Sequence, residues 1–292
     1  MSEQYQFEAI GTHWTIDILG EVPIVSMHQL SISIDARIAE FNKTYSRFRA
    51  DSLVSQIAKA KGVYAFPEDA GPLFALYERV YKTTNGRVTP LIGQVMVEAG
   101  YDAKYSLVEG NLSTPPTWAE AMQFDPGTNT LEVFQDGVLL DFGAAGKGYL
   151  IDIVSELIER EGFSSYIVDA GGDIRHRGTE PIRVGLEHPG DTSMAIGIAS
   201  LSNKSICGSA GNRRAWGRFH HIIDPFKLES PRHIIAVWTL ADSTILADAM
   251  TTALMFAEPA QLQQKFVFEY LLMFADSSVE QSAGFPAELF TA

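Results

Sequence analysis

The chain has 292 residues, of which 46% are apolar, 11% aromatic and 20% charged, so it is long enough to bury one large core or two modest ones. Its formal net charge of −14 would repel a polyanion over most of the surface, which argues against nucleic acid or an anionic membrane as a partner. No apolar run approaches the length needed for membrane insertion, and a phosphate ligand would have to be met by local amides, basic side chains or a metal.

Helical and β-rich patterns are mixed along the chain. Helices are predicted where apolar residues recur every three or four positions, at residues 30–41, 73–80, 150–158 and 247–254. Strands are predicted at residues 138–142, 166–168, 182–186 and 234–240. A hairpin is expected around the turn at residues 135–137, and strands that follow one another directly favour antiparallel pairing. The predicted class is α+β, with mostly antiparallel sheets flanked by helices.

No repeat, low-complexity tract or linker divides the sequence. Residues 109–125, which include Pro115 and Pro116, are predicted to form a loop. We therefore expect a single domain over residues 1–292, with two subdomains near that loop as the alternative. Residues 1–4 have no basic or apolar signal features, which favours a cytoplasmic protein unless an export segment has been removed. The single cysteine, Cys207, is interpreted as a small buried residue.

A glycine-rich turn covers residues 141–148, directly after a predicted strand and before a predicted helix. Backbone amides and Lys147 in such a turn are placed to contact a phosphate. The turn is not a P-loop, because Asp141 stands at the first glycine of that motif and Gly148 at its Ser or Thr. Two interpretations stay open from these residues alone: a diphosphate or nucleotide site, and a structural turn without a ligand.

Two further turns combine small and charged residues. Asp169 begins one of them after a predicted strand, and residues 208–214 form the other. Paired Arg213 and Arg214 beside flexible small residues would suit an anion. A solvated surface turn with its own ion pairs is an equal alternative for either stretch.

His220 and His221 are adjacent in a predicted strand, so their side chains point to opposite faces and only one of them faces a given site. Asp224 follows three residues after His221 and precedes a proline. This spacing is compatible with a catalytic His/Asp pair, and a structural, hydrogen-bonded histidine is the alternative.

Asp248 and Thr252 lie four residues apart in a predicted helix and therefore share one face. A carboxylate and a hydroxyl form a hard-oxygen pair suited to Mg²⁺, which usually completes its octahedron with water and substrate phosphate. The alternative is an acid at a helix N-terminus next to a residue at the edge of the core.

Taken in order, these motifs resemble those of the ApbE family of flavin transferases. The resemblance extends from Gly11 and Thr12 to the C-terminal segment, and the order of its motifs makes it specific. The matching segments are Tyr45-Ser46-Arg47-Phe48 with Ser52, Thr89-Pro90-Leu91-Ile92, and residues 141–149, 170–174, 185–189, 221–225 and 247–252.

The resemblance implies an ApbE-like, T-fold-like α+β fold that binds FAD between two halves. It also implies an enzyme that transfers FMN from FAD to a Thr or Ser hydroxyl of an acceptor protein and releases AMP. Mg²⁺ would be held by Asp248, Thr252 and the carbonyl of Gly146, while His221 acts as general base, oriented or made more basic by Asp224.

The same resemblance implies which residues contact FAD. These cofactor-binding positions are Ser52, Gly143, Gly146, Lys147, Gly148, Gly171, Gly172, Asp173, Arg213 and Arg214. Two alternatives to the transferase remain. With water as nucleophile the same centre would be an FAD diphosphatase giving FMN and AMP, and without turnover it would be an FAD-binding protein.

Overall fold

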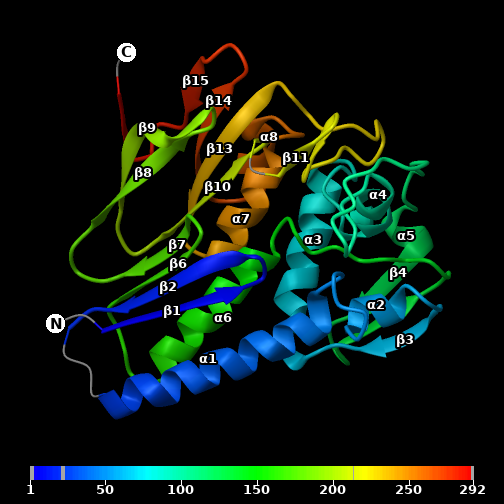
Figure 1. Cartoon of the computed structure of the whole chain (residues 1–292), viewed down its shortest axis with the longest axis horizontal. Helices are drawn as coiled ribbons and strands as arrows, with labels where there is room; N and C mark the ends of the chain where they lie inside the picture. The colour runs from blue at the N-terminus through cyan, green and yellow to red at the C-terminus, as the bar shows by residue number, and fades with distance from the viewer. Residues whose placement is uncertain (1–2, 21–23, 213, 291–292) are drawn as a thin grey trace.

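The computed structural model describes residues 3–20, 24–212 and 214–290. Figure 1 shows large sheets in the left half of the view, and a helical part with a small sheet in the right half. Helices α6 and α7 lie between the two halves, and the long helix α1 runs beneath them. The site described below is formed where the two halves meet.

The helices and strands are as follows. The helices are α1 (Ile24–Tyr45), α2 (Leu53–Ile57), α3 (Gly71–Thr83), α4 (Gly93–Glu98), α5 (Trp118–Ala121), α6 (Gly146–Arg160), α7 (Thr244–Ala253) and α8 (Pro259–Gln263). The strands are β1 (Glu3–Ala9), β2 (Thr12–Ile18), β3 (Gly62–Ala65), β4 (Met122–Asp125), β5 (Thr130–Val133), β6 (Tyr166–Ala170), β7 (Asp173–Arg177), β8 (Ile182–His188), β9 (Asp191–Leu201), β10 (Ser205–Ala210), β11 (Ala215–Trp216), β12 (Phe219–His220), β13 (Ile234–Ala241), β14 (Glu269–Phe274), β15 (Val279–Gln281) and β16 (Ala287–Leu289).

An eight-stranded sheet of order β1-β2-β6-β7-β10-β13-β14-β15 forms the centre of the molecule. The strand pairs described in it are all antiparallel, which confirms the predicted α+β class. Smaller sheets have the orders β16-β9-β8, β3-β5-β4 and β11-β12. In the described residues, no helix is long and apolar enough to cross a membrane.

Both faces of the central sheet are buried. Side chains alternate between the two faces along each strand, so successive residues belong to different cores. In β13, Val237 belongs to the core shared with α1, α6 and α7, whereas Ala236 and Trp238 belong to the core shared with β8 and β9. Helices therefore cover one face and a small sheet covers the other. The ends of the inner strands are left to line the site.

Most predicted elements are present, with two exceptions. The loop predicted at residues 109–125 is wrong from Trp118 onward, where α5 and β4 stand. The helices predicted at residues 30–41, 73–80 and 150–158 lie within α1, α3 and α6, and the strand predicted at 234–240 lies within β13. The strand predicted at residues 138–142, and the hairpin around 135–137, are wrong, because β5 pairs with β3 and β4 instead. Residues 138–142 pack against the segment after Thr89, with Asp141 N donating to Pro90 O at 2.7 Å. Their apolar side chains are buried by packing and not by a sheet.

The turn between β6 and β7 requires glycine. Ala170 pairs directly with Asp173, which leaves a two-residue loop of Gly171 and Gly172 with φ of 65° and 95°. Such turns need positive φ at both positions because they match the twist of the strands. A Cβ on Gly171 would also overlap the Thr12 hydroxyl. The loop thus brings the ends of β2, β6 and β7 close together.

Candidate active site

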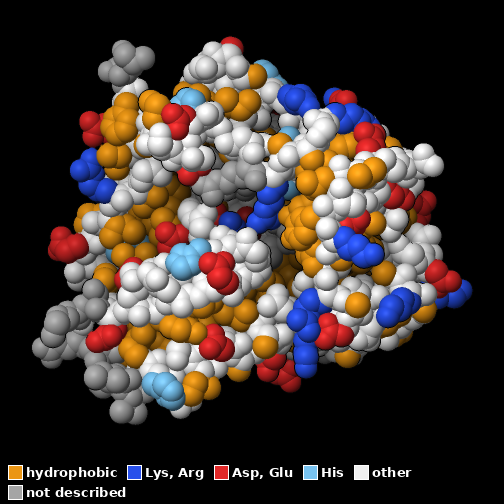
Figure 2. All heavy atoms as spheres, in the orientation of Figure 1, with side chains coloured by type: hydrophobic (Ala, Val, Ile, Leu, Met, Phe, Trp, Pro, Cys, Tyr) orange, Lys and Arg blue, Asp and Glu red, His pale blue; other side chains and the backbone are white. Residues whose placement is uncertain are grey.

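A cleft of about 1300 Å³ lies between the two halves. Figure 2 shows this face of the molecule hollowed near its middle, with Lys or Arg side chains at the hollow. The cleft exceeds the range of about 300–1,000 Å³ that is usual for small ligands, so it has room for a large one. Ten of the predicted site residues line it: Gly143, Gly146, Lys147, Gly171, Gly172, Asp173, Arg214, His221, Asp248 and Thr252.

Basic side chains gather in this cleft although the chain as a whole is strongly acidic. Its described lining includes Arg47, Arg87, Lys147, Arg183 and Arg214. Carboxylates accompany them, so the cleft is a mixed site and not a uniformly positive one. Because the chain has a net charge of −14, a phosphate ligand needs positive side chains close to it, and these basic residues supply them.

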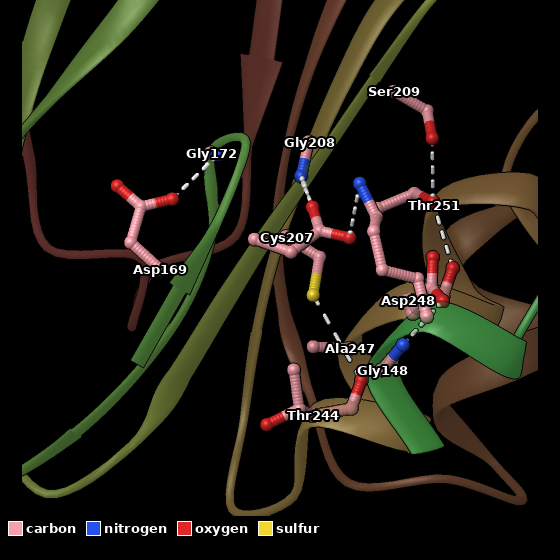
Figure 3. A network of polar contacts seen from close by, with 12 residues as sticks. Gly148, Asp169, Gly172, Cys207, Gly208, Ser209, Thr244, Ala247, Asp248 and Thr251 are labelled. Atoms are coloured by element: carbon pink, nitrogen blue, oxygen red, sulfur yellow. Dashed lines mark hydrogen bonds and ion pairs between the residues drawn. The ribbon is translucent and has the colours of Figure 1, made fainter. Parts of the chain in front are cut away.

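Asp248 projects from α7 and Thr252 lies one helical turn later on the same face, as the sequence predicts. One oxygen of Asp248 accepts the amide of Gly148 at 2.8 Å (Figure 3). Burial, and then the nearby Asp173 carboxylate, raise the pKa of Asp248 well above its usual range, against the opposing effect of Lys147. Burial and Asp173 disfavour the charged form of Asp248, and a bound cation would stabilise that form.

The glycine-rich turn has few free amides. Gly143 N donates to Asp141 Oδ1 at 2.6 Å, and Ala144 N donates to the Tyr77 hydroxyl at 3.2 Å. The amides of Ala145 and Gly146 donate to the carbonyl of Phe142. The prediction of an amide cradle for phosphate is therefore wrong for these amides. What the turn offers to the cleft is its carbonyl oxygens and the Lys147 side chain.

Lys147 is held by Asp173 of β7. The Lys147 ammonium lies 2.9 Å from an Asp173 oxygen, and the other oxygen of Asp173 accepts the amide of Gly208 at 3.1 Å. Burial alone would lower the pKa of Lys147, but Asp173 and Asp248 outweigh it and raise that pKa. Lys147 is therefore a fixed positive charge beside Asp248.

The two adjacent histidines have different environments. His220 is tied on both ring nitrogens, with Nε2 at 2.8 Å from Pro231 O and Nδ1 accepting Ile222 N at 3.2 Å. His221 lines the cleft, and no described residue bonds its buried Nδ1. Burial, followed by the charges of Arg214 and its neighbours, lowers the pKa of His221 to about 3. The imidazole is therefore neutral near pH 7, as a proton acceptor must be.

Asp224 does not line the cleft beside His221. Its carboxylate lies 3.4 Å from Arg87 Nε and accepts the amides of Phe226 and Lys227 at 2.8 and 3.0 Å. Within the described part of the chain, no hydrogen bond joins Asp224 to His221. The expected orientation of His221 by Asp224 is therefore contradicted, because the loop after the histidine turns this carboxylate towards its own amides.

Two other predicted residues, Ser52 and Gly148, also lie apart from the cleft lining. Ser52 is fully buried and caps α2, where its hydroxyl accepts Ser55 N at 3.1 Å. Gly148 is buried at the crossing of α6 and α7, where a Cβ would overlap Thr244 O. Arg213 lies outside the described residues. A direct contact with FAD thus has no support in the placement of Ser52 or Gly148.

Arg47 and Tyr101 are cleft residues that motif chemistry did not single out. Arg47 forms a buried ion pair with Asp141 and donates to Tyr101 O at 2.7 Å. Tyr101 stacks on Trp216 with ring centroids 5.4 Å apart. No short spacing in the sequence signals these contacts, because Arg47 and Asp141 are 94 residues apart.

The side chains present fit a hard divalent cation. Gly146 at the start of α6 lines the same cleft as Asp248 and Thr252 of α7, and Gly148, two residues after Gly146, donates its amide to Asp248. The Asp248 carboxylate, the Thr252 hydroxyl and the Gly146 carbonyl are oxygen donors of the kind that Mg²⁺ prefers, and the set leaves positions for water and phosphate. In the described residues, no group of three or more His, Cys, Asp or Glu side chains gathers as a metal site. A cation here would therefore be held by the single Asp248 carboxylate together with the Thr252 hydroxyl, the Gly146 carbonyl and a ligand phosphate.

Comparisons with known proteins show the family of this chain. The model of the ApbE family matches residues 10–268. The chain belongs to the ApbE family. A relative from Klebsiella pneumoniae, named FAD:protein FMN transferase, is 25% identical over 88% of this chain and 79% of its own. A relative of the same name from Vibrio cholerae is 25% identical over 84% of this chain and 78% of its own.

Solved structures confirm the ApbE fold. The flavin transferase ApbE from Vibrio cholerae superposes with a TM-score of 0.82 at 22% identity, over 98% of this chain and 99% of that one. The ApbE protein from Thermotoga maritima gives a TM-score of 0.82 at 20% identity, over 99% of this chain and 100% of that one. At this level of identity the likeness concerns the fold.

Proposed function

We propose that this ApbE-family protein transfers the FMN part of FAD to a Thr or Ser hydroxyl of an acceptor protein and releases AMP. The observation that carries the proposal is the convergence of Gly146, Asp248, Thr252, Lys147 and His221 on one cleft between the two halves. The family relatives named FAD:protein FMN transferase support the same activity. A cytoplasmic location stays a prediction.

Asp248, Thr252 and the Gly146 carbonyl would hold Mg²⁺, which when bound neutralises charge that develops on the diphosphate. Lys147 adds a fixed positive charge to the same corner, held in place by Asp173. Gly171, Gly172 and Arg214 line the remaining cleft and are proposed to contact the flavin half of FAD and the acceptor.

His221 is proposed to take the proton of the acceptor hydroxyl. As that proton leaves, the hydroxyl oxygen forms a bond to the phosphorus on the riboflavin side, and the bond from this phosphorus to the bridging oxygen breaks. AMP departs with the bridging oxygen and its electron pair. His221 supports this role because it lines the cleft, its imidazole is neutral near pH 7, and no described residue bonds its Nδ1.

The proposal is tested by incubating the protein with FAD and MgCl₂, with and without an acceptor that carries a flavinylation-type Thr or Ser. A fluorescent acceptor whose mass increases by one FMN, together with AMP, is the expected result. Free FMN and AMP regardless of acceptor would instead establish the diphosphatase. FAD that stays bound and unchanged would establish a binding protein and refute both enzymes.

A further inference from the structure

Helix α7, which carries Asp248, begins without a cap from its own sequence. Ser243 precedes it without forming a capping hydrogen bond in the described residues, and the first turn contains no acidic residue. The first two amides donate instead to Asp152 of α6, from Thr244 and Ile245, each at 2.8 Å. Both oxygens of Asp152 are used, so a neighbouring helix supplies the cap that α7 lacks.

The same face of α6 contacts α7 a second time. Gly148 and Asp152 are four residues apart and therefore project towards the same side of α6. Gly148 N donates to Asp248, and a Cβ at Gly148 would overlap Thr244 O and lie 2.7 Å from Asp248 Cβ. Figure 3 shows Gly148 beside both Thr244 and Asp248. Helix α6 thus holds α7 at its start and again at Asp248.

We propose that Asp152 is a positioning residue for the cation site. By fixing the start of α7 on α6, it sets where Asp248 stands relative to Gly146 at the start of α6. The start of α7 and Asp248 are four residues apart, about 6 Å along the helix, so a displacement at the start reaches Asp248 within one rigid turn. This role rests on the proposed function, because Asp248 is a metal ligand only there.

Other contacts also hold α7. At its start, the hydroxyls of Ser205 and Thr244 share a hydrogen bond of 2.7 Å, which holds the Thr244 side chain, whereas Asp152 holds the first two backbone amides. Thr239 donates to Ala247 O at 2.6 Å, and Ser209 and Thr251 share a hydrogen bond of 2.9 Å. These bonds tie the middle of the helix to β13 and β10. In the cleft lining that the structure describes, Asp152 is absent, so it acts through α7 and not by touching a ligand.

The test is the affinity of the full-length protein for Mn²⁺ without FAD, measured by electron paramagnetic resonance. Asp152→Asn keeps the shape of the side chain but leaves one of the two amides without an acceptor, and we expect about tenfold weaker Mn²⁺ binding. Ser155→Ala is the matched control, because its hydroxyl bonds Ile151 O at 2.8 Å within the same helix. It should lower the unfolding temperature and leave the Mn²⁺ affinity unchanged.

Equal Mn²⁺ affinity in the wild type and Asp152→Asn would overturn the positioning role alone. Equal weakening by Ser155→Ala would also overturn it, since the effect would then be general destabilisation. A wild type that binds no Mn²⁺ would overturn the proposed cation site and the positioning role together. If Asp152→Asn does not fold, Ile245→Pro removes one donor at a first-turn position that tolerates proline, and the same tenfold weakening is expected.

Discussion

The two sides of the cleft differ in how far the protein itself satisfies their polar groups. On the α6–α7 side, Asp248 accepts an amide and Lys147 is paired with Asp173. On the other side, no described residue bonds Nδ1 of His221, and Asp224 is turned towards Arg87. The first side is therefore held in place by the fold before a ligand arrives. The second side leaves the orientation of its base to packing and to the ligand.

The largest expected effect is on the α6–α7 side. Asp248→Asn should lower FMN transfer by about 10³-fold, the loss of several kcal/mol of cation-dependent stabilisation. Because the pKa of Asp248 is raised by burial and by Asp173, its charged form costs stability in the metal-free protein. The variant should therefore unfold at the same or a higher temperature without metal, as thermal unfolding would show. Asp242→Asn, an exposed carboxylate just before α7, is the control and should keep full activity.

The second prediction separates the two histidines. His221→Gln should lower kcat by about 10²-fold or more through loss of the general base, with little change in stability at pH 7. His220→Gln should lower the free energy of unfolding by about 1–2 kcal/mol, because its two ring hydrogen bonds are lost, and should change kcat less. Steady-state kinetics and urea unfolding of both variants check this. A larger loss of kcat in His220→Gln than in His221→Gln would refute His221 as the base.

The third prediction concerns pH. His221 has its pKa lowered to about 3 in the folded protein, whereas in the unfolded chain it takes up a proton below about pH 6.5. The free energy of unfolding therefore falls as the pH falls from about 6.5 towards 3. Between pH 7.5 and pH 5, the His221→Gln variant should lose less of this free energy than the wild type, by at most about 2 kcal/mol. Urea unfolding at pH 7.5 and pH 5 measures it. Equal losses in wild type and variant would show that His221 titrates normally.

The smallest effect is expected at Asp224. Because its carboxylate binds Arg87 and two amides of its own loop, Asp224→Asn should change kcat by less than about fivefold. Kinetics at pH 7 over a range of FAD concentrations check this. A loss as large as that of His221→Gln would show that the loop rearranges on binding and brings Asp224 to the histidine.

Local patterns in the sequence were enough for much of the fold and part of the site. The spacing of Asp248 and Thr252 places both on one helical face, and the adjacent histidines divide as expected into one structural residue and one cleft residue. The segment at residues 138–142 misled, because its apolar side chains are buried by packing and not by strand pairing. Periodicity reports that a residue is buried but not which element buries it.

By itself, the sequence determined the helices with clear apolar spacing, the antiparallel character of the sheets and, through its ordered motifs, the family. Only the tertiary structure decided what the polar groups of the site bind. The amide of Ala144 meets Tyr77 from 67 residues away, and the amide of Gly148 meets Asp248 from 100 residues away. Such partners are chosen by how α3, α6 and α7 pack, and no local pattern in the chain encodes that choice.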